Sequence, residues 1–235
     1  MGVFRFKQFQ LTDDHSAMKV GMDSVLLACW LRAANYSRIL DVGCGSGLIA
    51  LILAQRFPNA QINGIDIDAD SLLDANENFR NSPWNGRLSA MHKDVREYQA
   101  EQSFDLIVTN PPYFSESLLP PETKRAGVRH DIHLSLAELL WSARRLLSAG
   151  GTFALVFPYE RADELLNQAG DVGFYSKRIM YLRNKPGAQI KRIFVEFVLR
   201  KPETEVEKEY LFVRNAEGDY APEYREITKD FYLKF

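Results

Sequence analysis

Asp41-Val42-Gly43-Cys44-Gly45-Ser46-Gly47 places three glycines between two apolar runs of the chain. The residues before it, 38–42, predict a short strand, and the largely apolar run 48–57 after it predicts a helix. Because glycine has no Cβ, three glycines let the chain turn sharply and let a ligand approach the backbone. The helix that follows directs its free N–H groups towards that ligand. The stretch therefore predicts a strand–loop–helix unit with a ligand at the loop, and a tight turn without a ligand is the alternative on this motif alone.

Strand and helix patterns alternate along the rest of the chain. Predicted strands cover 38–42, 61–67, 88–93, 104–109, 152–157, 176–182 and 193–199, and predicted helices cover 23–35, 48–57, 69–80, 135–147 and 160–169. This alternation predicts an α/β fold with a doubly wound, mostly parallel, seven-stranded sheet. The short loop 184–188 makes the last strand antiparallel. We expect an N-terminal extension and entry helix over 1–35, a core over 36–200 and an acidic C-terminal tail over 201–235 that packs on the core.

Composition sets limits on the class of protein. The chain has 235 residues and a formal net charge of −2, which fits one α/β domain without an overall basic excess. A local basic face is nevertheless sufficient to bind nucleic acid. The two cysteines, Cys29 and Cys44, are interpreted as free thiols, and no apolar run approaches a membrane span, so we expect a cytoplasmic protein. The four histidines lack the spacing of a metal site, and no metal is assigned.

Acidic residues stand before the glycine loop and at the ends of the next two predicted strands. Ligands of an open α/β sheet lie outside this C-terminal edge. Asp66 can accept both hydrogen bonds of a ribose diol, and Asp94 can accept one from the exocyclic amine of an adenine. Each alone fits an ordinary surface acid, but together with the loop they predict a cofactor site. Its predicted residues are Asp41, Gly43, Gly45, Gly47, Asp66, Asp94 and the backbone N–H of Val95.

Asn110-Pro111-Pro112-Tyr113 follows the predicted strand 104–109. Pro111 keeps Asn110 extended, and the two prolines stiffen the segment. The Asn110 side-chain oxygen and the Pro111 carbonyl can accept the two hydrogens of an amino group on a planar ring. The nitrogen lone pair then becomes available to a methyl donor, a positioning effect that lowers the barrier. Tyr113 can stack on the ring, so we predict that all four residues are catalytic; a plain Pro-Pro turn is the alternative.

The glycine loop, the acidic residues and Asn110–Tyr113 together resemble class I S-adenosylmethionine-dependent amino-methyltransferases, which have a Rossmann-like fold. Residues 19–28, Lys-Val-Gly-Met-Asp-Ser-Val-Leu-Leu-Ala, resemble the entry helix of the bacterial tRNA1(Val) adenine-N6 methyltransferases. The resemblance adds Asp23 to the cofactor site. It implies S-adenosyl-L-methionine as cofactor and methylation of adenine 37 beside the anticodon. It also implies the anticodon stem-loop of tRNA as partner, with no obligate protein partner.

Two other functions stay open at this point. Asn110–Tyr113 alone also resembles release-factor glutamine N5-methyltransferases, but these carry a helical domain before the core, for which residues 1–37 are too few. A noncatalytic module that senses the cofactor or binds RNA is the third possibility.

Two basic clusters favour RNA over protein as the substrate. Their predicted RNA-binding residues are Lys124, Arg125 and Arg129 in the loop after Tyr113, and Lys185, Lys191 and Arg192 around the last hairpin. Either cluster alone also fits a solvated charged loop.

Overall fold

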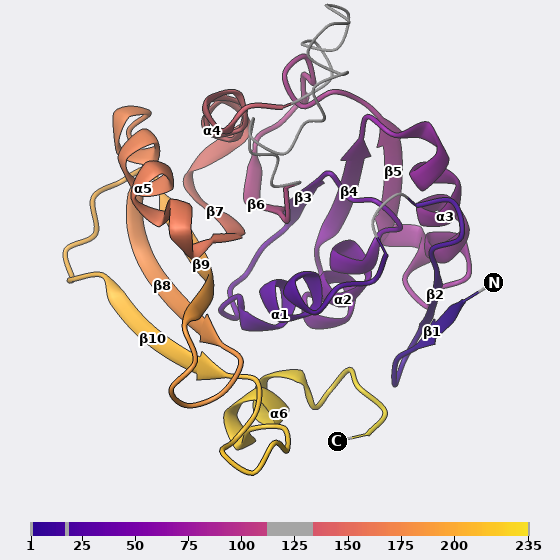
Figure 1. The fold of residues 1–235 in the computed structure, drawn as a ribbon. Helices are drawn as coiled ribbons and strands as arrows, with labels where there is room; N and C mark the ends of the chain where they lie inside the picture. The colour runs from indigo at the N-terminus through magenta and orange to yellow at the C-terminus, as the bar shows by residue number, and fades with distance from the viewer. Residues whose placement is uncertain (1, 17–18, 112–133, 235) are drawn as a thin grey trace, which may run out of the picture.

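An eight-stranded sheet in the order β10-β8-β9-β7-β6-β3-β4-β5 forms the centre of the computed structural model, which describes residues 2–16, 19–111 and 134–234 (Figure 1). Its strands are β3 (Arg38–Val42), β4 (Gln61–Asp66), β5 (Leu88–His92), β6 (Phe104–Thr109), β7 (Leu147–Pro158), β8 (Tyr175–Arg183), β9 (Ile190–Val198) and β10 (Glu207–Phe212). Their pairings are parallel except those of β9, which runs antiparallel to β7 and β8. The predicted doubly wound, mostly parallel α/β fold is confirmed, and β10 is an eighth strand that the sequence did not predict.

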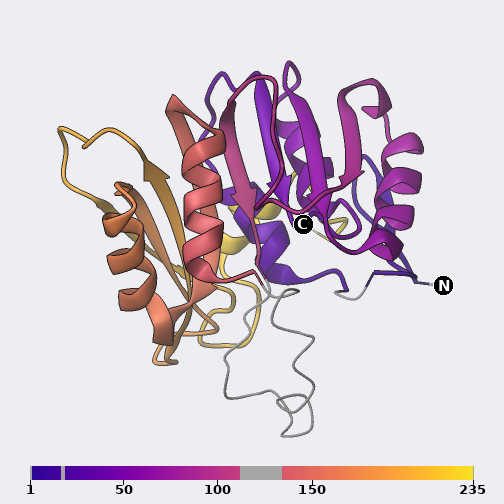
Figure 2. The same cartoon turned by 90° about the horizontal axis from the view of Figure 1, so that it is seen from above.

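Helices cover both faces of this sheet. They are α1 (Met22–Trp30), α2 (Leu48–Arg56), α3 (Ala69–Arg80), α4 (Leu136–Leu146), α5 (Ala162–Asp171) and α6 (Pro222–Thr228). Neighbouring strand residues point to opposite faces, so Ile39 packs with α1, α2, α3 and α6 while Leu40 packs with α4 and α5. Figure 2 shows α4 and α5 standing together at one side of the sheet.

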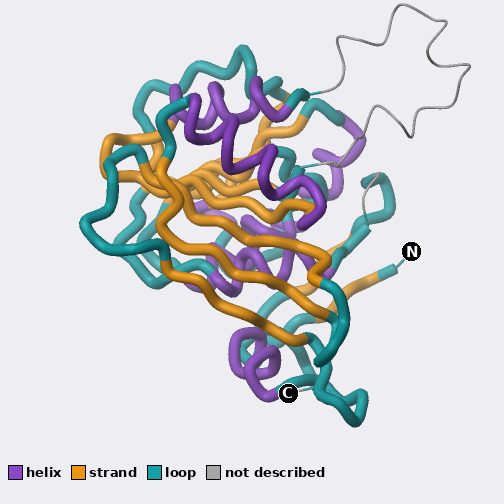
Figure 3. The backbone as a smooth tube through the Cα atoms, turned by 60° about the vertical axis from the view of Figure 1, so that its left-hand side comes forward, coloured by secondary structure: helices purple, strands orange, loops and turns teal. Residues whose placement is uncertain are grey.

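The two ends of the described chain meet. Strands β1 (Val3–Arg5) and β2 (Gln10–Thr12) form a hairpin apart from the main sheet. Phe6 forms an isolated bridge with Tyr232, and the Lys7 backbone N–H donates to the Phe231 carbonyl at 2.8 Å. Figure 3 shows the strands of the main sheet side by side, with helices above and below them. Residues 201–235 supply β10 and α6 rather than an irregular tail, while the proposed division of the chain at 35 and 200 stays a prediction.

The C-terminal ends of the central strands form the edge at which ligands of such folds lie. Strands β3 and β6 are neighbours, and their register pairs Val42 with Thr109. The Thr109 hydroxyl also donates to the Val42 carbonyl at 2.8 Å. The glycine loop after β3 and Asn110 after β6 therefore leave the same edge side by side. Among the described residues, no helix has the length and apolar character needed to cross a membrane.

Candidate active site

The glycine loop leaves its backbone open at two positions. Gly43, Gly45 and Gly47 have φ values of 69°, 52° and 83°, in the left-handed region that favours glycine. A Cβ built on Gly43 or Gly45 would meet no atom within 4 Å. The Gly43 N–H donates to the Ile65 carbonyl at 2.8 Å, which ties the loop to β4. The loop is thus fixed at its start and has open space beside Gly43 and Gly45 for a ligand.

Gly47 has a packing role that the sequence did not reveal. A Cβ at this position would lie 2.3 Å from the Phe79 ring. Glycine is therefore needed at the start of α2 for close contact with α3. The contact of Gly47 with a cofactor stays a prediction.

Asp66 holds the glycine loop from the end of β4. Its carboxylate accepts the Gly45 N–H at 2.8 Å and the Asp68 N–H at 2.9 Å, one on each oxygen. An ionised carboxylate has about four acceptor positions, so these bonds leave capacity for ribose hydroxyls. Asp66 thus holds the glycine loop and lies next to the residues at the ends of β4 and β5.

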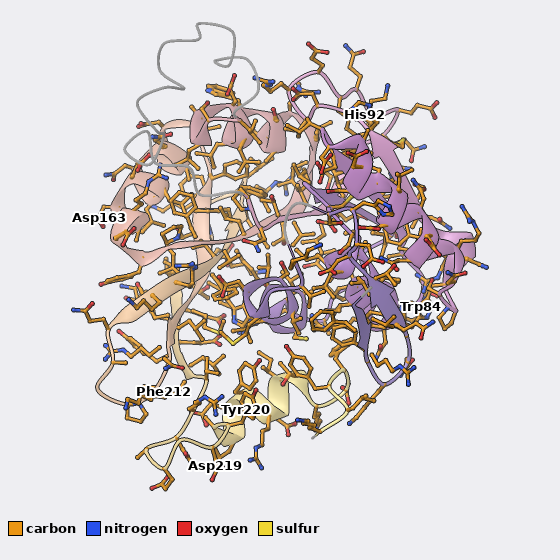
Figure 4. The ribbon with its side chains drawn as sticks, turned by 45° about the vertical axis from the view of Figure 1, so that its right-hand side comes forward. Trp84, His92, Asp163, Phe212, Asp219 and Tyr220 are labelled. Atoms are coloured by element: carbon orange, nitrogen blue, oxygen red, sulfur yellow. The ribbon has the colours of Figure 1, made fainter. Side chains whose placement is uncertain are left out.

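An open pocket lies beside Asp66, at the ends of β4 and β5. It is lined by Ile67, His92, Lys93, Asp94, Glu97 and Tyr98. Figure 4 shows His92, one of these residues, at the upper right of the molecule. The Ile67 side chain is 47% exposed, an apolar surface of the kind on which a flat ring can lie.

Asp94 is already bonded to protein groups in this pocket. Arg96 donates to its carboxylate from the backbone N–H at 2.8 Å, Nε at 2.9 Å and Nη2 at 2.6 Å. The Arg96 side-chain hydrogen bonds hold the pKa of Asp94 below its usual range. An adenine amine would have to share this carboxylate with Arg96. Val95, the next residue, is buried, and both contacts with adenine stay predictions.

Asp41 is a completely buried carboxylate at the end of β3. Its Oδ2 accepts the Ala50 N–H of α2 at 3.1 Å, while Oδ1 is buried and accepts no hydrogen bond from the described residues. Burial raises the pKa of Asp41 to about 8. Because a buried carboxylate without a full set of partners is costly, this position favours a ligand that brings positive charge.

These features fit the S-adenosylmethionine that the sequence resemblance implies. The orphan oxygen of Asp41 suits its positively charged end, the open backbone at Gly43 and Gly45 allows close approach, and the pocket beside Ile67 suits its adenine.

Asn110 is held by a residue of the entry helix. Its Nδ2 donates to the Ser24 hydroxyl of α1 at 2.9 Å. The amide nitrogen thus faces Ser24, which leaves the side-chain oxygen as the acceptor that this amide can offer a substrate amine. Ser24 stands 86 residues before Asn110, and only its place in the segment resembling an entry helix could have drawn attention to it.

Asp23 and Arg192, predicted for the cofactor and for RNA respectively, lie against each other. Arg192 Nε donates to Asp23 Oδ2 at 2.9 Å, and both side chains are half-buried. This ion pair anchors the first turn of α1 to the start of β9. Lys185 and Lys191 are exposed near the same hairpin, and all of these assigned roles stay predictions.

Several predicted residues lie outside the described part of the chain. They are Pro112, Tyr113, Lys124, Arg125 and Arg129. Pro111 is described and buried. Within residues 2–16, 19–111 and 134–234, no group of three or more His, Cys, Asp or Glu side chains could hold a metal ion.

Comparison with known proteins identifies the family. The model of the methyltransferase small domain matches residues 10–169. The chain belongs to the methyltransferase small domain family. Within this family it is 41% identical over 98% of both chains to a protein of Bacteroides fragilis strain YCH46 named tRNA1(Val) (adenine(37)-N6)-methyltransferase. It is 36% identical to a protein of the same name from Yersinia pestis strain Pestoides F, over 100% of this chain and 95% of that one.

Solved methyltransferase structures share the fold of this family member. A predicted O-methyltransferase from Agrobacterium tumefaciens superposes with a TM-score of 0.69 at 18% identity, over 89% of this chain and 96% of that chain. The glycopeptide N-methyltransferase MtfA complexed with sinefungin superposes with a TM-score of 0.58 at 12% identity, over 80% and 90% of the two chains. The expected class I, Rossmann-like fold is thereby confirmed.

Proposed function

We propose that the chain transfers the methyl group of S-adenosylmethionine to the N6 amine of adenine 37 in tRNA1(Val). The observation that carries this proposal is the register of β3 and β6, which pairs Val42 with Thr109. It brings the open glycine loop and the Asn110 amide to one point of the sheet edge. Relatives named for this activity align over nearly the whole chain and support the choice of substrate.

The chain's own residues contribute binding and positioning. S-adenosylmethionine supplies a methyl group activated by a sulfonium. Asp66 and the pocket beside Ile67 would bind the nucleoside part, and the buried Asp41 would compensate the positive charge by losing its proton beside it. The Asn110 side-chain oxygen and the Pro111 carbonyl accept the two N6 hydrogens, so that the nitrogen lone pair is directed at the methyl group. The methyl group would pass directly to the amine with no covalent bond to the protein, leaving S-adenosylhomocysteine, and the surplus proton of the amine would pass to water.

The RNA must present adenine 37 unpaired. Bases of a single-stranded loop can be turned out at low cost, which fits an anticodon stem-loop as the part of tRNA that is bound. Lys185, Lys191 and Arg192 are described residues with which the hairpin beside α1 can contact phosphates. We place the reaction in the cytoplasm, where tRNA is modified.

A methyl-transfer assay tests this function. Purified protein is incubated with labelled S-adenosylmethionine and unmodified tRNA1(Val), and the RNA is digested and analysed by mass spectrometry. We expect N6-methyladenosine at position 37 and no label in a tRNA with guanine at that position. A parallel reaction offers a release factor as acceptor. Transfer only to that protein would support the glutamine methyltransferase instead, and binding of the cofactor without any transfer would support a noncatalytic module.

A further inference from the structure

Three tyrosine rings form a continuous row across the part of the sheet that lies beyond Asn110. We call the surroundings of Asn110 the methyl-acceptor site. Tyr159 begins the short helix η4 (Tyr159–Arg161) directly after β7, Tyr181 lies in β8 and Tyr210 lies in β10. The ring centroids of Tyr159 and Tyr181 are 6.1 Å apart in an edge-to-face arrangement. Those of Tyr181 and Tyr210 are 5.1 Å apart and nearly parallel, at 23°. We call these residues the tyrosine row.

The row starts beside the strand that carries Asn110. Strand β7 pairs in parallel with β6, and Tyr159 follows the last residue of β7. Strands β8 and β7 both run antiparallel to β9, and β10 is parallel to β8, so β6, β7, β8 and β10 all end at one edge. The row therefore extends from the methyl-acceptor site towards the outer strand β10. The cofactor pocket lies in the opposite direction, as the positions of Phe212, at the end of β10, and His92 show in Figure 4.

The rings are too exposed for a purely internal packing role. Tyr210 is 59% exposed and Tyr159 is 42% exposed, with the half-buried Tyr181 between them. A stacked pair across neighbouring strands does stabilise a sheet, but that role needs only the faces that touch. The outer surfaces of Tyr159 and Tyr210 stay in contact with solvent and can receive further flat rings.

Charge on β10 is sorted between the two faces of the sheet. Glu207 and Glu209 are directed to the face of α1, where they pair with Arg32 and Arg178 respectively. Lys208 and Tyr210 alternate with them and are exposed on the other face. The two acids of β10 are thus turned away from the tyrosine row.

Exposed lysines lie at the β8 and β10 part of the row, and exposed acids follow its Tyr159 end. Lys185 and Lys191 lie at the hairpin that follows β8, and Lys208 lies two residues before Tyr210. Glu160 and Asp163 follow Tyr159. Aromatic rings interleaved with basic side chains are the features with which proteins hold unpaired nucleotides, because every base has a face that can stack.

We propose that the tyrosine row is a stacking platform for unpaired bases of the RNA substrate next to the methylated adenine. The proposal rests on the function proposed above and specifies how that RNA is held. An anticodon loop supplies unpaired bases on both sides of the target adenine. With the adenine at Asn110, a neighbouring base can stack on Tyr159, and the chain can continue towards Tyr210 with its phosphates near Lys208.

Binding of a fluorescein-labelled RNA hairpin with the sequence of the unmodified anticodon stem-loop tests the proposal. We expect Tyr159→Ala and Tyr210→Ala each to weaken binding about tenfold, within the range for loss of one stacked base. Tyr210→Phe keeps the ring and should bind like the unchanged protein. Tyr175→Ala is the matched control, because Tyr175 is exposed at the opposite end of β8 and should leave affinity unchanged. Circular dichroism verifies that each variant is folded.

The outcomes separate this inference from the proposed function. Unchanged RNA affinity in Tyr159→Ala and Tyr210→Ala would overturn the platform and leave the exposed rings to a protein partner. Equal losses in Tyr210→Ala and Tyr210→Phe would also overturn it, because stacking does not need the hydroxyl. If the unchanged protein transfers no methyl group to tRNA, the proposed function itself fails, whatever the tyrosine variants bind.

Discussion

Asn110 can act only if its amide oxygen, and not its nitrogen, meets the substrate amine. In the structure Asn110 Nδ2 donates to the Ser24 hydroxyl, so the amide is held with its nitrogen towards α1. We predict that Ser24→Ala lowers kcat about five- to tenfold, which corresponds to about 1 kcal/mol, the usual value of one such bond. Affinity for S-adenosylmethionine, measured by calorimetry, should not change. Ser24→Thr retains the hydroxyl and should restore most of kcat, and equal kcat in Ser24→Ala and the unchanged protein would exclude this positioning role.

Asp41 makes stability depend on pH. Burial raises its pKa to about 8 in the folded chain, whereas an unfolded aspartate titrates near 4. Between these values the folded state holds the extra proton, so the contribution of Asp41 to the free energy of unfolding falls as pH rises. We predict that cofactor-free Asp41→Asn gains stability relative to the unchanged protein from pH 5 to pH 8 in urea unfolding. Parallel pH profiles for the two proteins would contradict this assignment.

At the scale of elements, the glycine loop allows α2 and α3 to pack closely as well as facing a ligand. Both Gly45 and Gly47 have left-handed backbones, so replacing either with alanine should cost roughly 1–2 kcal/mol of stability. Because a Cβ at Gly47 would also collide with Phe79, Gly47→Ala should lose about 1–3 kcal/mol more, the usual cost of overpacking. Gly45→Ala meets open space and should lose only the backbone part, yet weaken cofactor binding. Urea unfolding and calorimetry measure the two effects. In Gly47→Ala, adding Phe79→Leu should recover part of the loss, and no recovery would contradict the collision.

Local signals explain which elements the sequence predicted well. The helix over 69–80 and the strand over 104–109 have the predicted bounds, because a capping aspartate begins one and Asn-Pro follows the other. The helix predicted over 160–169 begins two residues later, at Ala162, since Tyr159–Arg161 form a 3-10 turn after Pro158. Short segments whose boundaries are set by their own residues are therefore predictable from sequence.

Contacts between distant parts of the chain explain what was missed. The residues of strand β10 show no clear hydrophobic period. The strand forms by pairing with β8, where Tyr210 lies opposite Tyr181 and Leu211 lies opposite Leu182. The bond between Ser24 and Asn110, and the ion pair between Asp23 and Arg192, also depend on the assembled sheet. The glycine loop and the strand-end acids could be placed because the sheet edge itself follows from the βαβ pattern.

At the scale of the whole molecule, the proposed sites for the nucleoside, for methyl transfer and for RNA follow one another along the edge of the sheet. The nucleoside pocket lies at β4 and β5, the loop and Asn110 lie at β3 and β6, and the tyrosine row lies at β7, β8 and β10. Cofactor and RNA can therefore approach from opposite sides and meet at the centre, where the register of Val42 and Thr109 sets the distance between loop and amide. We propose that the amine accepts the methyl group at this central point.

Single-turnover methyl transfer to tRNA1(Val) by Asn110→Ala tests that claim most directly. With enzyme in excess and saturating S-adenosylmethionine, the rate reports the chemical step, while calorimetry reports cofactor affinity separately. We predict that the variant binds the cofactor as tightly as the unchanged protein but forms N6-methyladenosine at least a hundredfold more slowly, about 2.7 kcal/mol of lost transition-state stabilisation. An unchanged rate in Asn110→Ala would contradict this arrangement, because the amine would then be methylated without the amide that lies beside the glycine loop.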